Sequence, residues 1–222
     1  MGRPAASRAD LPGAGRLREG GSMRIDSASE FVQAAVAAVV FFCWLALAAV
    51  FLFKARGRRP ETERRVPASI AGIVLQGFGF ACSWGPQRRT FGPFTPGPPA
   101  LGLILAGLAA SLAVGSTWLT LLAVRVLGRE WSFQARLVEG HRLVTEGPYG
   151  LVRHPIYTGM LGMLLATNLA VGHWIALAPG LVLFAAGTFI RVRSEEKLLR
   201  AAFGQRFEEY ARRVPAVIPG LR

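Results

Sequence analysis

At residues 143–159 the chain reads LVTEGPYGLVRHPIYTG, and this stretch decides how the rest of the sequence is divided. Its first part is polar and rich in Gly and Pro, which is typical of a loop. It opens into the run Pro155–Ile190, 36 residues without Asp, Glu, Lys or Arg, after which charged residues resume at once over 191–196. The pattern predicts two polar clusters at one membrane boundary, with apolar helices between them.

Three further apolar blocks precede this run. Phe31–Phe53 and Ala100–Val124 contain 23 and 25 uncharged residues, more than the roughly 20 that cross a bilayer core. Val66–Trp84 is a weaker block of 19 residues, because it contains Pro67, Gln76 and several Gly. The blocks predict transmembrane helices rather than a soluble core.

Basic residues are distributed unevenly between the loops. Segments 54–65 and 125–153 and the tail from residue 191 together carry 19 Lys and Arg, whereas the N-terminal tail and loop 85–99 carry 7. The positive-inside rule therefore predicts a cytoplasmic C-terminus and an external N-terminus. The Arg-rich, Lys-poor composition favours a bacterial inner membrane. Because the net charge of +13 lies between apolar blocks, we expect membrane lipid and no nucleic acid as a partner.

The predicted fold is an all-α integral membrane protein with about five transmembrane helices. The last apolar run is divided near Gly172 into two helices of about 17 residues that form a helical hairpin, a marginal length for spanning. A cytoplasmic cap precedes the hairpin and a C-terminal amphipathic helix follows it. The corresponding division is a disordered tail over 1–27, three transmembrane helices over 28–124, and a C-terminal region over 125–222 that holds the candidate site.

Two patterns predict how these helices pack. The third apolar block carries Gly102, Gly107, Ser111 and Gly115, small residues that permit close approach of a neighbouring helix. The tail over 193–211 has apolar residues at steps of three and four. This period predicts an amphipathic helix that lies against the membrane or the cap.

The dipeptide His154-Pro155 predicts the start of a helix. Pro suits the first helical turn, where a missing N–H costs nothing, and it holds the preceding residue extended. The side chains of Arg153 and His154 would then converge with the free N–H groups of residues 156–158. Such a helix N-terminus is a site for a carboxylate or a phosphate.

At the other end of the run, Arg191 and Glu195 lie four residues apart on one helix face, with Glu196 beside them. An exposed pair at this spacing is worth roughly 0.3–0.5 kcal/mol and has no further meaning. Alternatively, the carboxylate binds a cationic ligand group and the arginine an anionic one. Spacing alone leaves both open. The chain contains no phosphate-binding loop, no serine-hydrolase motif and no zinc spacing.

Together these segments resemble the isoprenylcysteine carboxyl methyltransferase family. The resemblance is carried by His141-x-Leu-Val-x-x-Gly-x-Tyr149, by His154-Pro-x-Tyr157-x-Gly159, by Arg191-x-x-x-Glu195-Glu196 and by Phe203-Gly-x-x-Phe207-x-x-Tyr210-x-x-Arg213-Val-Pro215. It covers roughly residues 125–219, and the first two helices show no specific resemblance. The Arg-His-Pro-x-Tyr segment alone is less specific, because phospholipid methyltransferases and membrane sterol reductases carry similar segments.

The resemblance implies an integral membrane methyltransferase with S-adenosylmethionine as cofactor and a lipophilic acceptor at the cytoplasmic face. The acceptor would be a carboxylate, or else an amine or a thiol. Residues 125–222 become the cofactor-binding catalytic region. The cofactor contacts carried over from the family are Gln134, His141, Leu143, Val144, Tyr149, His154, Pro155, Tyr157 and Glu195. Arg191 falls near the acceptor carboxylate, and His154 or Glu196 would take the proton of an amine or thiol.

Two other functions stay open: a nicotinamide-dependent membrane reductase of a sterol- or polyprenyl-like substrate, and a non-catalytic membrane protein. Reductases that share this corner are larger, and 222 residues is short for them. The residues give neither the identity of the acceptor nor the oligomeric state, and they leave Met1 and Met23 as alternative starts. The methyltransferase hypothesis depends on one juxtaposition, in which Glu195 and Glu196 fold back beside His154.

Overall fold

The computed structural model describes residues 19–55, 63–65, 68–85, 99–128, 131, 136–138, 142–172 and 174–221. The described helices are α1 (Glu19–Ala55), α2 (Ala68–Trp84), α3 (Pro99–Leu127), α4 (Pro155–Ala170), α5 (Trp174–Phe203) and α6 (Gln205–Arg213), with a 3-10 helix over Gly147–Gly150. Two three-residue strands, β1 (Glu63–Arg65) and β2 (Arg136–Val138), pair antiparallel. The helical fold class is confirmed. Helix α1 begins at Glu19, inside the segment expected to be a disordered tail.

Among the described helices, three are long and apolar enough to cross a membrane: Glu30–Lys54, Ala100–Leu127 and Ile175–Phe203. Helices α2 and α4 are shorter, with 17 and 16 residues. Large apolar side chains such as Phe42 and Ile104 are exposed on the long helices, as expected of surfaces that lipid covers. The structure therefore supports a membrane protein, and the count of five spans stays a prediction.

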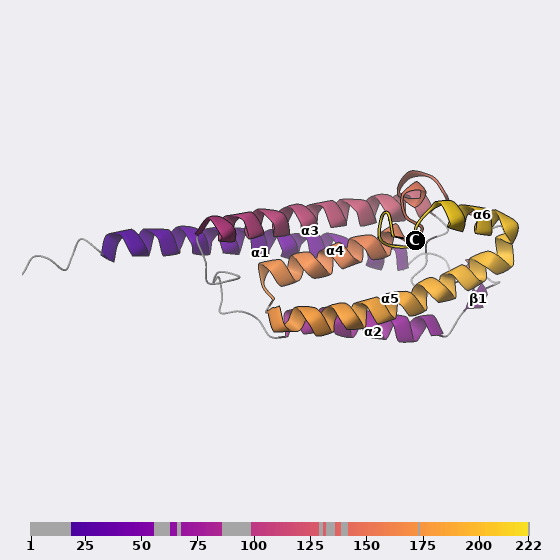
Figure 1. The fold of residues 1–222 in the computed structure, drawn as a ribbon, viewed down its shortest axis with the longest axis horizontal. Coiled ribbons are helices and arrows are strands. Elements are labelled where there is room, and N and C mark those ends of the chain that lie inside the picture. The colour runs from indigo at the N-terminus through magenta and orange to yellow at the C-terminus, as the bar shows by residue number, and fades with distance from the viewer. Residues whose placement is uncertain are drawn as a thin grey trace, which may run out of the picture.

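The helices pack as two antiparallel pairs. Helix α4 lies along α3, and α5 lies along α2 (Figure 1), while α1 packs against α3 and, to a lesser extent, α4. The consecutive helices α4 and α5 are joined by a short turn after Ala170, but each makes its more extensive contacts with another helix. The candidate site therefore lies where two separately built pairs meet.

Close packing within the α2–α5 pair depends on glycine. A Cβ atom added at Gly79 would lie 2.8 Å from the carbonyl oxygen of Gly180, and one added at Gly72 would lie 2.7 Å from that of Gly187. Backbones at this separation leave no room for a side chain between them. We call this contact the α2–α5 seam.

The α3–α4 pair has a corresponding α3–α4 seam. A Cβ atom added at Gly159 would lie 2.8 Å from the carbonyl oxygen of Ser116. The prediction that Gly102, Gly107 and Gly115 of α3 meet a neighbouring helix is wrong, because a Cβ atom at any of them has nothing within 4 Å. The contacting face of α3 is instead made of Ala and hydroxyl residues, namely Ala106, Ala109, Ala113, Ser116, Thr117 and Thr120, all buried.

Helix α5 is longer than predicted. The expected span of about 17 residues ends near Ile190, whereas α5 has 30 residues and continues through the charged segment to Phe203. The charged residues do not end the helix, because several of them form ion pairs with other residues of the fold. The interruption comes at Gly204, whose φ of 50° lies in the left-handed region that favours glycine. The predicted amphipathic helix over 193–211 is therefore divided between α5 and α6.

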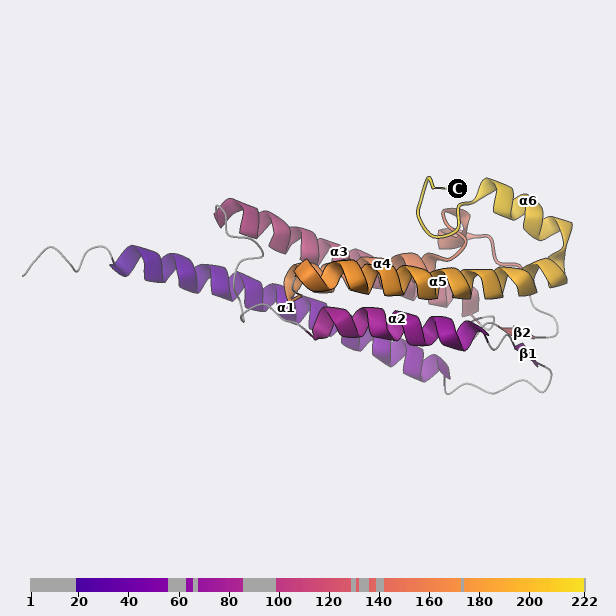
Figure 2. The same cartoon turned by 60° about the horizontal axis from the view of Figure 1, so that its bottom comes forward.

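One end of the bundle collects the polar elements. Helix α6, the 3-10 helix and both strands gather there, while the N-terminal part of α1 extends past the opposite end (Figure 2). Lys54, at the end of α1, donates from Nζ to the carbonyl oxygen of Gly128 at 3.2 Å. The described parts of the basic segments that were expected to share one side of the membrane thus lie at the same end of the molecule.

Candidate functional site

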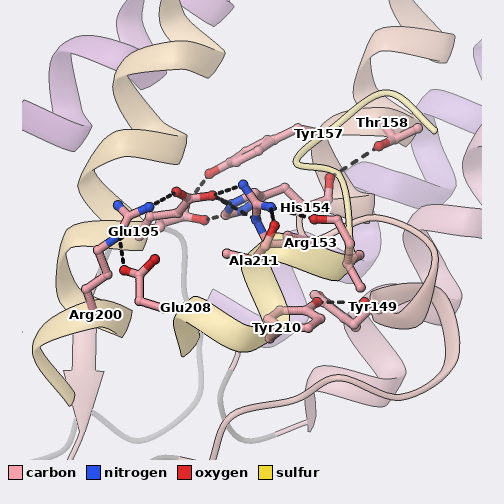
Figure 3. Close-up of polar contacts among 12 residues, drawn as sticks. Tyr149, Arg153, His154, Tyr157, Thr158, Glu195, Arg200, Glu208, Tyr210 and Ala211 are labelled. Carbon is pink, nitrogen blue, oxygen red and sulfur yellow. Dashed lines mark hydrogen bonds and ion pairs between the residues drawn. The ribbon is translucent and has the colours of Figure 1, made fainter. Parts of the chain in front are cut away.

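The corner at His154 is built by backbone contacts with the C-terminal segment. The amide N–H of Arg153 donates to the carbonyl oxygen of Pro215 at 2.8 Å, and that of His154 donates to Ala216 at 2.9 Å. The Thr158 hydroxyl donates to the carbonyl oxygen of Val217. We call residues 214–217 the C-terminal brace. It holds the corner in place immediately before α4 begins at Pro155 (Figure 3).

The predicted anion site at this helix start is only partly present. The N–H groups of Tyr157 and Thr158 both donate to the carbonyl oxygen of His154, at 3.0 and 3.2 Å. Two of the three N–H groups that were expected to be free are therefore already bonded. The correction follows from the tight first turn, which closes on the residue before Pro155.

The predicted juxtaposition of His154 with the two glutamates is confirmed. His154 Nδ1 lies 3.2 Å from Glu195 Oε2, and Nε2 lies 3.5 Å from Glu196 Oε1. The imidazole is buried and stacks on the Tyr157 ring. Burial alone would lower the pKa of His154, but the two carboxylates outweigh it and raise this pKa above its ordinary value.

Arg191 joins the same cluster from one turn earlier on α5. Its Nε donates to the Tyr157 hydroxyl at 2.7 Å, and its Nη2 lies 3.7 Å from Glu195 Oε1. The Tyr157 hydroxyl in turn donates to Glu195 Oε1. Arg191 is only 7% exposed, so the interpretation as a solvated surface pair does not apply.

Glu196 is enclosed by cations. Arg153 donates to Glu196 Oε1, with Nε at 3.0 Å, and Arg200 donates to Oε2, with Nη2 at 3.0 Å. Arg153 also donates from Nη1 to the carbonyl oxygens of Ala211 and Val214. Glu196 therefore links α5 to the His154 corner and, through Arg153, to the end of α6.

These contacts define a polar cluster between the start of α4 and the charged part of α5 (Figure 3). Its members are Arg153, His154, Tyr157, Arg191, Glu195 and Glu196. All six are largely buried, and Glu195 is the more open of its two carboxylates, with 26% of its side chain exposed against 8% for Glu196. A charged ligand group would therefore meet Glu195 before Glu196.

Other predicted site residues are not members of the cluster. Val144 and Tyr149 form a small apolar core with Ala123, and burial raises the pKa of Tyr149. Leu143 lines a cavity of about 400 Å³ together with Thr145, Arg206, Glu209, Tyr210, Arg213 and Val214. The predicted contacts Gln134 and His141 lie outside the described residues.

Sequence reasoning missed three residues that support the site. Tyr210 of α6 donates from its hydroxyl to the carbonyl oxygen of Tyr149 at 2.6 Å, and Arg200 pairs with Glu196. Gln76 of α2 accepts from Arg191 Nη1 at 3.5 Å. Gln76 could have been found, because a polar side chain inside an apolar helix is costly to bury and often marks a functional site.

Comparison with known proteins bears on residues 104–206, which match the family model described as phospholipid methyltransferase. The cobalt-zinc-cadmium resistance protein CzcN of Cupriavidus metallidurans is 39% identical over 125 residues, covering 54% of this chain and 50% of that protein. Protein-S-isoprenylcysteine O-methyltransferase B of Arabidopsis thaliana is 34% identical over 99 residues, covering 44% and 50%.

Methanethiol S-methyltransferase 2 of Bradyrhizobium diazoefficiens is 33% identical over 135 residues, covering 52% of this chain and 49% of that protein. The chain thus spans about half the length of these curated relatives. The matched segment contains α4, most of α3 and all of α5, and therefore both sides of the polar cluster. The family resemblance inferred from the sequence is confirmed over this segment.

Proposed function

From the resemblance of residues 104–206 to membrane methyltransferases, isoprenylcysteine carboxyl methyltransferases among them, we propose that the protein transfers a methyl group from S-adenosylmethionine to a lipophilic acceptor. The observation that carries this proposal is the contact between His154 and Glu195, which joins two motifs 41 residues apart. The proposed site faces the cytoplasm in a bacterial inner membrane, with the N-terminus outside; the excess of Lys and Arg in the loops on one side supports this orientation.

The residues present fit S-adenosylmethionine. Glu195 offers a partly open carboxylate to a group that carries a sulfonium and an ammonium. The buried Nε2 atom of His154 has no hydrogen-bond partner among the described residues, although Glu196 lies 3.5 Å away. Leu143, which the resemblance assigns to the cofactor, lines a cavity whose charged groups come from α6. Glu195, His154 and Tyr157 would hold the cofactor, with Leu143 and Tyr149 beside it.

Bound S-adenosylmethionine would supply an activated methyl group for an in-line displacement. The role of the chain is to orient the reactants and exclude water, since the reaction disperses charge and does not create it. The C-terminal brace and the small core around Val144 keep solvent from the corner. Glu196 positions Arg153 and His154 through its ion pairs, and Arg191 would bind an anionic group of the acceptor.

A carboxylate acceptor fits this cluster better than a thiol or an amine. A carboxylate already has its nucleophilic electron pair, so no proton has to be removed. The raised pKa of His154 means that its imidazole keeps a proton to higher pH than usual, so less of it is in the neutral form that could accept a proton from the acceptor. Arg191, less than a tenth exposed, offers a carboxylate the charge-assisted hydrogen bonds that a thiol does not use.

Titration of the detergent-purified full chain with S-adenosylmethionine tests the proposal, with wild type compared with Glu195→Ala. We expect wild type to bind and the variant to lose about 100-fold in affinity, because truncating one partner of a buried charge pair costs about 2–5 kcal/mol. The matched control is Glu208→Ala, an exposed glutamate that pairs with Arg200 outside the cluster.

Wild-type protein that binds no S-adenosylmethionine would contradict the proposal. Tight binding of a nicotinamide cofactor in its place would favour the reductase. Radiolabelled donor added to native membranes would then show whether a lipid or a protein fraction gains the methyl group.

A further inference from the structure

We propose that Gln76 of α2 is a positioning residue for Arg191, and that α2 thereby sets the affinity for a carboxylate acceptor. This inference rests on the proposed function, because it takes Arg191 as the group that binds the acceptor. It assigns a role to a helix that lies outside the matched segment 104–206.

The amide of Gln76 is fixed in orientation by two contacts. Its Nε2 donates to the Thr188 hydroxyl at 2.9 Å, and this contact turns Oε1 toward Arg191, whose Nη1 lies 3.5 Å away. Gln76 is 2% exposed, so water does not compete for these contacts. A buried amide is costly when its donor or its acceptor lacks a hydrogen-bond partner. Both groups of the Gln76 amide are bonded to residues of α5, so this cost is avoided.

The backbone of both helices leaves room for this arrangement. A Cβ atom added at Gly187 would lie 2.9 Å from Cγ of Gln76, so the side chain passes over α5 where no side chain obstructs it. A Cβ atom added at Gly72 would lie 2.5 Å from Cγ of Arg191. Gly72 therefore gives space to the aliphatic part of Arg191, while Gln76 contacts its guanidinium.

Among the described contacts, three side chains hold the guanidinium from different directions. Tyr157 accepts from Nε, Glu195 lies near Nη2, and Gln76 accepts from Nη1. Tyr157 and Glu195 also belong to the proposed cofactor site, whereas the described hydrogen bonds of Gln76 are to Thr188 and Arg191 and not to the His154 corner. Removal of Gln76 should therefore change the acceptor side of the reaction and leave the cofactor side unchanged.

The test compares Gln76→Leu, Gln76→Glu and the control Ser83→Ala in the detergent-purified full chain. Ser83 is a buried polar residue of the same helix that contacts Asn168 rather than Arg191. Donor binding is measured by titration with S-adenosylhomocysteine. Methyl transfer is measured with N-acetyl-S-farnesylcysteine, a lipophilic carboxylate, at saturating S-adenosylmethionine.

For Gln76→Leu we expect KM for the farnesylcysteine to rise about tenfold, as for the loss of one hydrogen bond to a charged group, with kcat within about threefold of wild type. S-adenosylhomocysteine affinity should be unchanged. Gln76→Glu should restore KM in part, because a carboxylate of the same length can hold the guanidinium. Ser83→Ala should leave KM as in wild type.

The outcomes separate this inference from the proposed function. An unchanged KM in Gln76→Leu, with wild-type transfer intact, overturns the inference alone. A wild type that binds S-adenosylhomocysteine but does not methylate the farnesylcysteine overturns the carboxylate role of Arg191 and, with it, the inference. A wild type that binds no S-adenosylhomocysteine overturns the proposed function itself. If Gln76→Leu lost donor affinity by the same factor as its KM rose, the role of Gln76 would be structural only, and the inference would be overturned.

Discussion

In both the α2–α5 seam and the α3–α4 seam, glycine lets two helix backbones approach closely, but the polar contacts in the two seams differ. In the α3–α4 seam, the Thr120 hydroxyl opposite Gly159 donates within α3 to the carbonyl oxygen of Ser116 at 2.9 Å, and the described bond that crosses, from the Thr117 hydroxyl to Met163 Sδ at 3.5 Å, involves no charged group. In the α2–α5 seam, a side chain crosses from one helix to the other, and Gln76 reaches both Thr188 and Arg191.

This difference shows how the site is assembled. The α3–α4 seam fixes the helix that begins at the His154 corner, and the α2–α5 seam fixes the helix that carries Arg191 and the two glutamates. Helices α4 and α5 make few direct contacts with each other. The polar cluster is therefore what joins the two pairs at the end of the molecule where the chemistry would occur.

The largest expected effect comes from breaking the polar cluster, which joins the two helix pairs. Glu196→Ala should lower the free energy of unfolding by about 3–5 kcal/mol, because it leaves Arg153 buried without its carboxylate. Thermal unfolding of the detergent-purified protein measures the change. Glu208→Ala removes the exposed partner of Arg200 and should shift the unfolding far less. Equal shifts would mean that the cluster does not join the helix pairs.

A smaller effect should follow from filling a seam. Gly159→Ala places a methyl group within contact distance of the Ser116 carbonyl and the Thr120 hydroxyl, and overpacking of this kind costs about 1–3 kcal/mol. Gly107→Ala, on α3, meets open space and should be neutral or slightly stabilising, since Ala favours a helix. The same unfolding measurement compares them, and a destabilised Gly107→Ala would place the seam on the wrong face of α3.

The polar cluster should also make stability depend on pH. The pKa of His154 is raised by Glu195 and Glu196, so its contribution is fully present below about pH 6.5 and is lost as pH rises through the folded-state pKa. Arg153 faces Glu196 and Arg191 faces Glu195, so both arginines contact the same carboxylates as His154. Burial raises the pKa of Tyr210 to about 12, outside this window.

The check is the unfolding midpoint of wild type and His154→Gln between pH 5.5 and 9. The wild-type advantage should shrink as pH rises. Parallel curves for the two proteins would show that His154 does not titrate against the glutamates in the folded state.

The smallest effect should come from Arg142, whose partner Glu146 lies four residues on at 2.9 Å, with 65% and 63% of the two side chains exposed. Arg142→Ala should change the free energy of unfolding by no more than about 0.5 kcal/mol. Salt added to the wild type should have a similarly small effect at this pair. A loss of several kcal/mol would contradict the expectation that exposed ion pairs contribute far less to stability than the buried pairs of the polar cluster.

Much of this architecture could be predicted from the residues. Long apolar blocks gave the helices, and α3 begins at Pro99, one residue before the predicted block. The Pro155 start and the contact of His154 with Glu195 also followed from local rules and the family resemblance. These features depend on short segments whose residue types are compatible with few other local structures.

Other features could not be predicted, because they depend on partners distant in the sequence. The continuation of α5 past Ile190 is supported by ion pairs such as those of Arg200 with Glu196 and Glu208, and hydropathy records only where the apolar surface stops. The glycines of α3 were expected to face a neighbour, but the helix is turned so that its Ala face packs inward. Gln76 was taken only as a weak point in an apolar block.

The C-terminal brace has a practical consequence for mutagenesis. Its bonds to Arg153 and His154 use main-chain carbonyl oxygens of Val214, Pro215 and Ala216, which every residue type possesses. A scan that replaces these side chains one at a time would therefore register almost nothing, however much the corner depends on them. Only a shift in backbone register, such as a one-residue deletion between Arg213 and Val217, would expose the dependence.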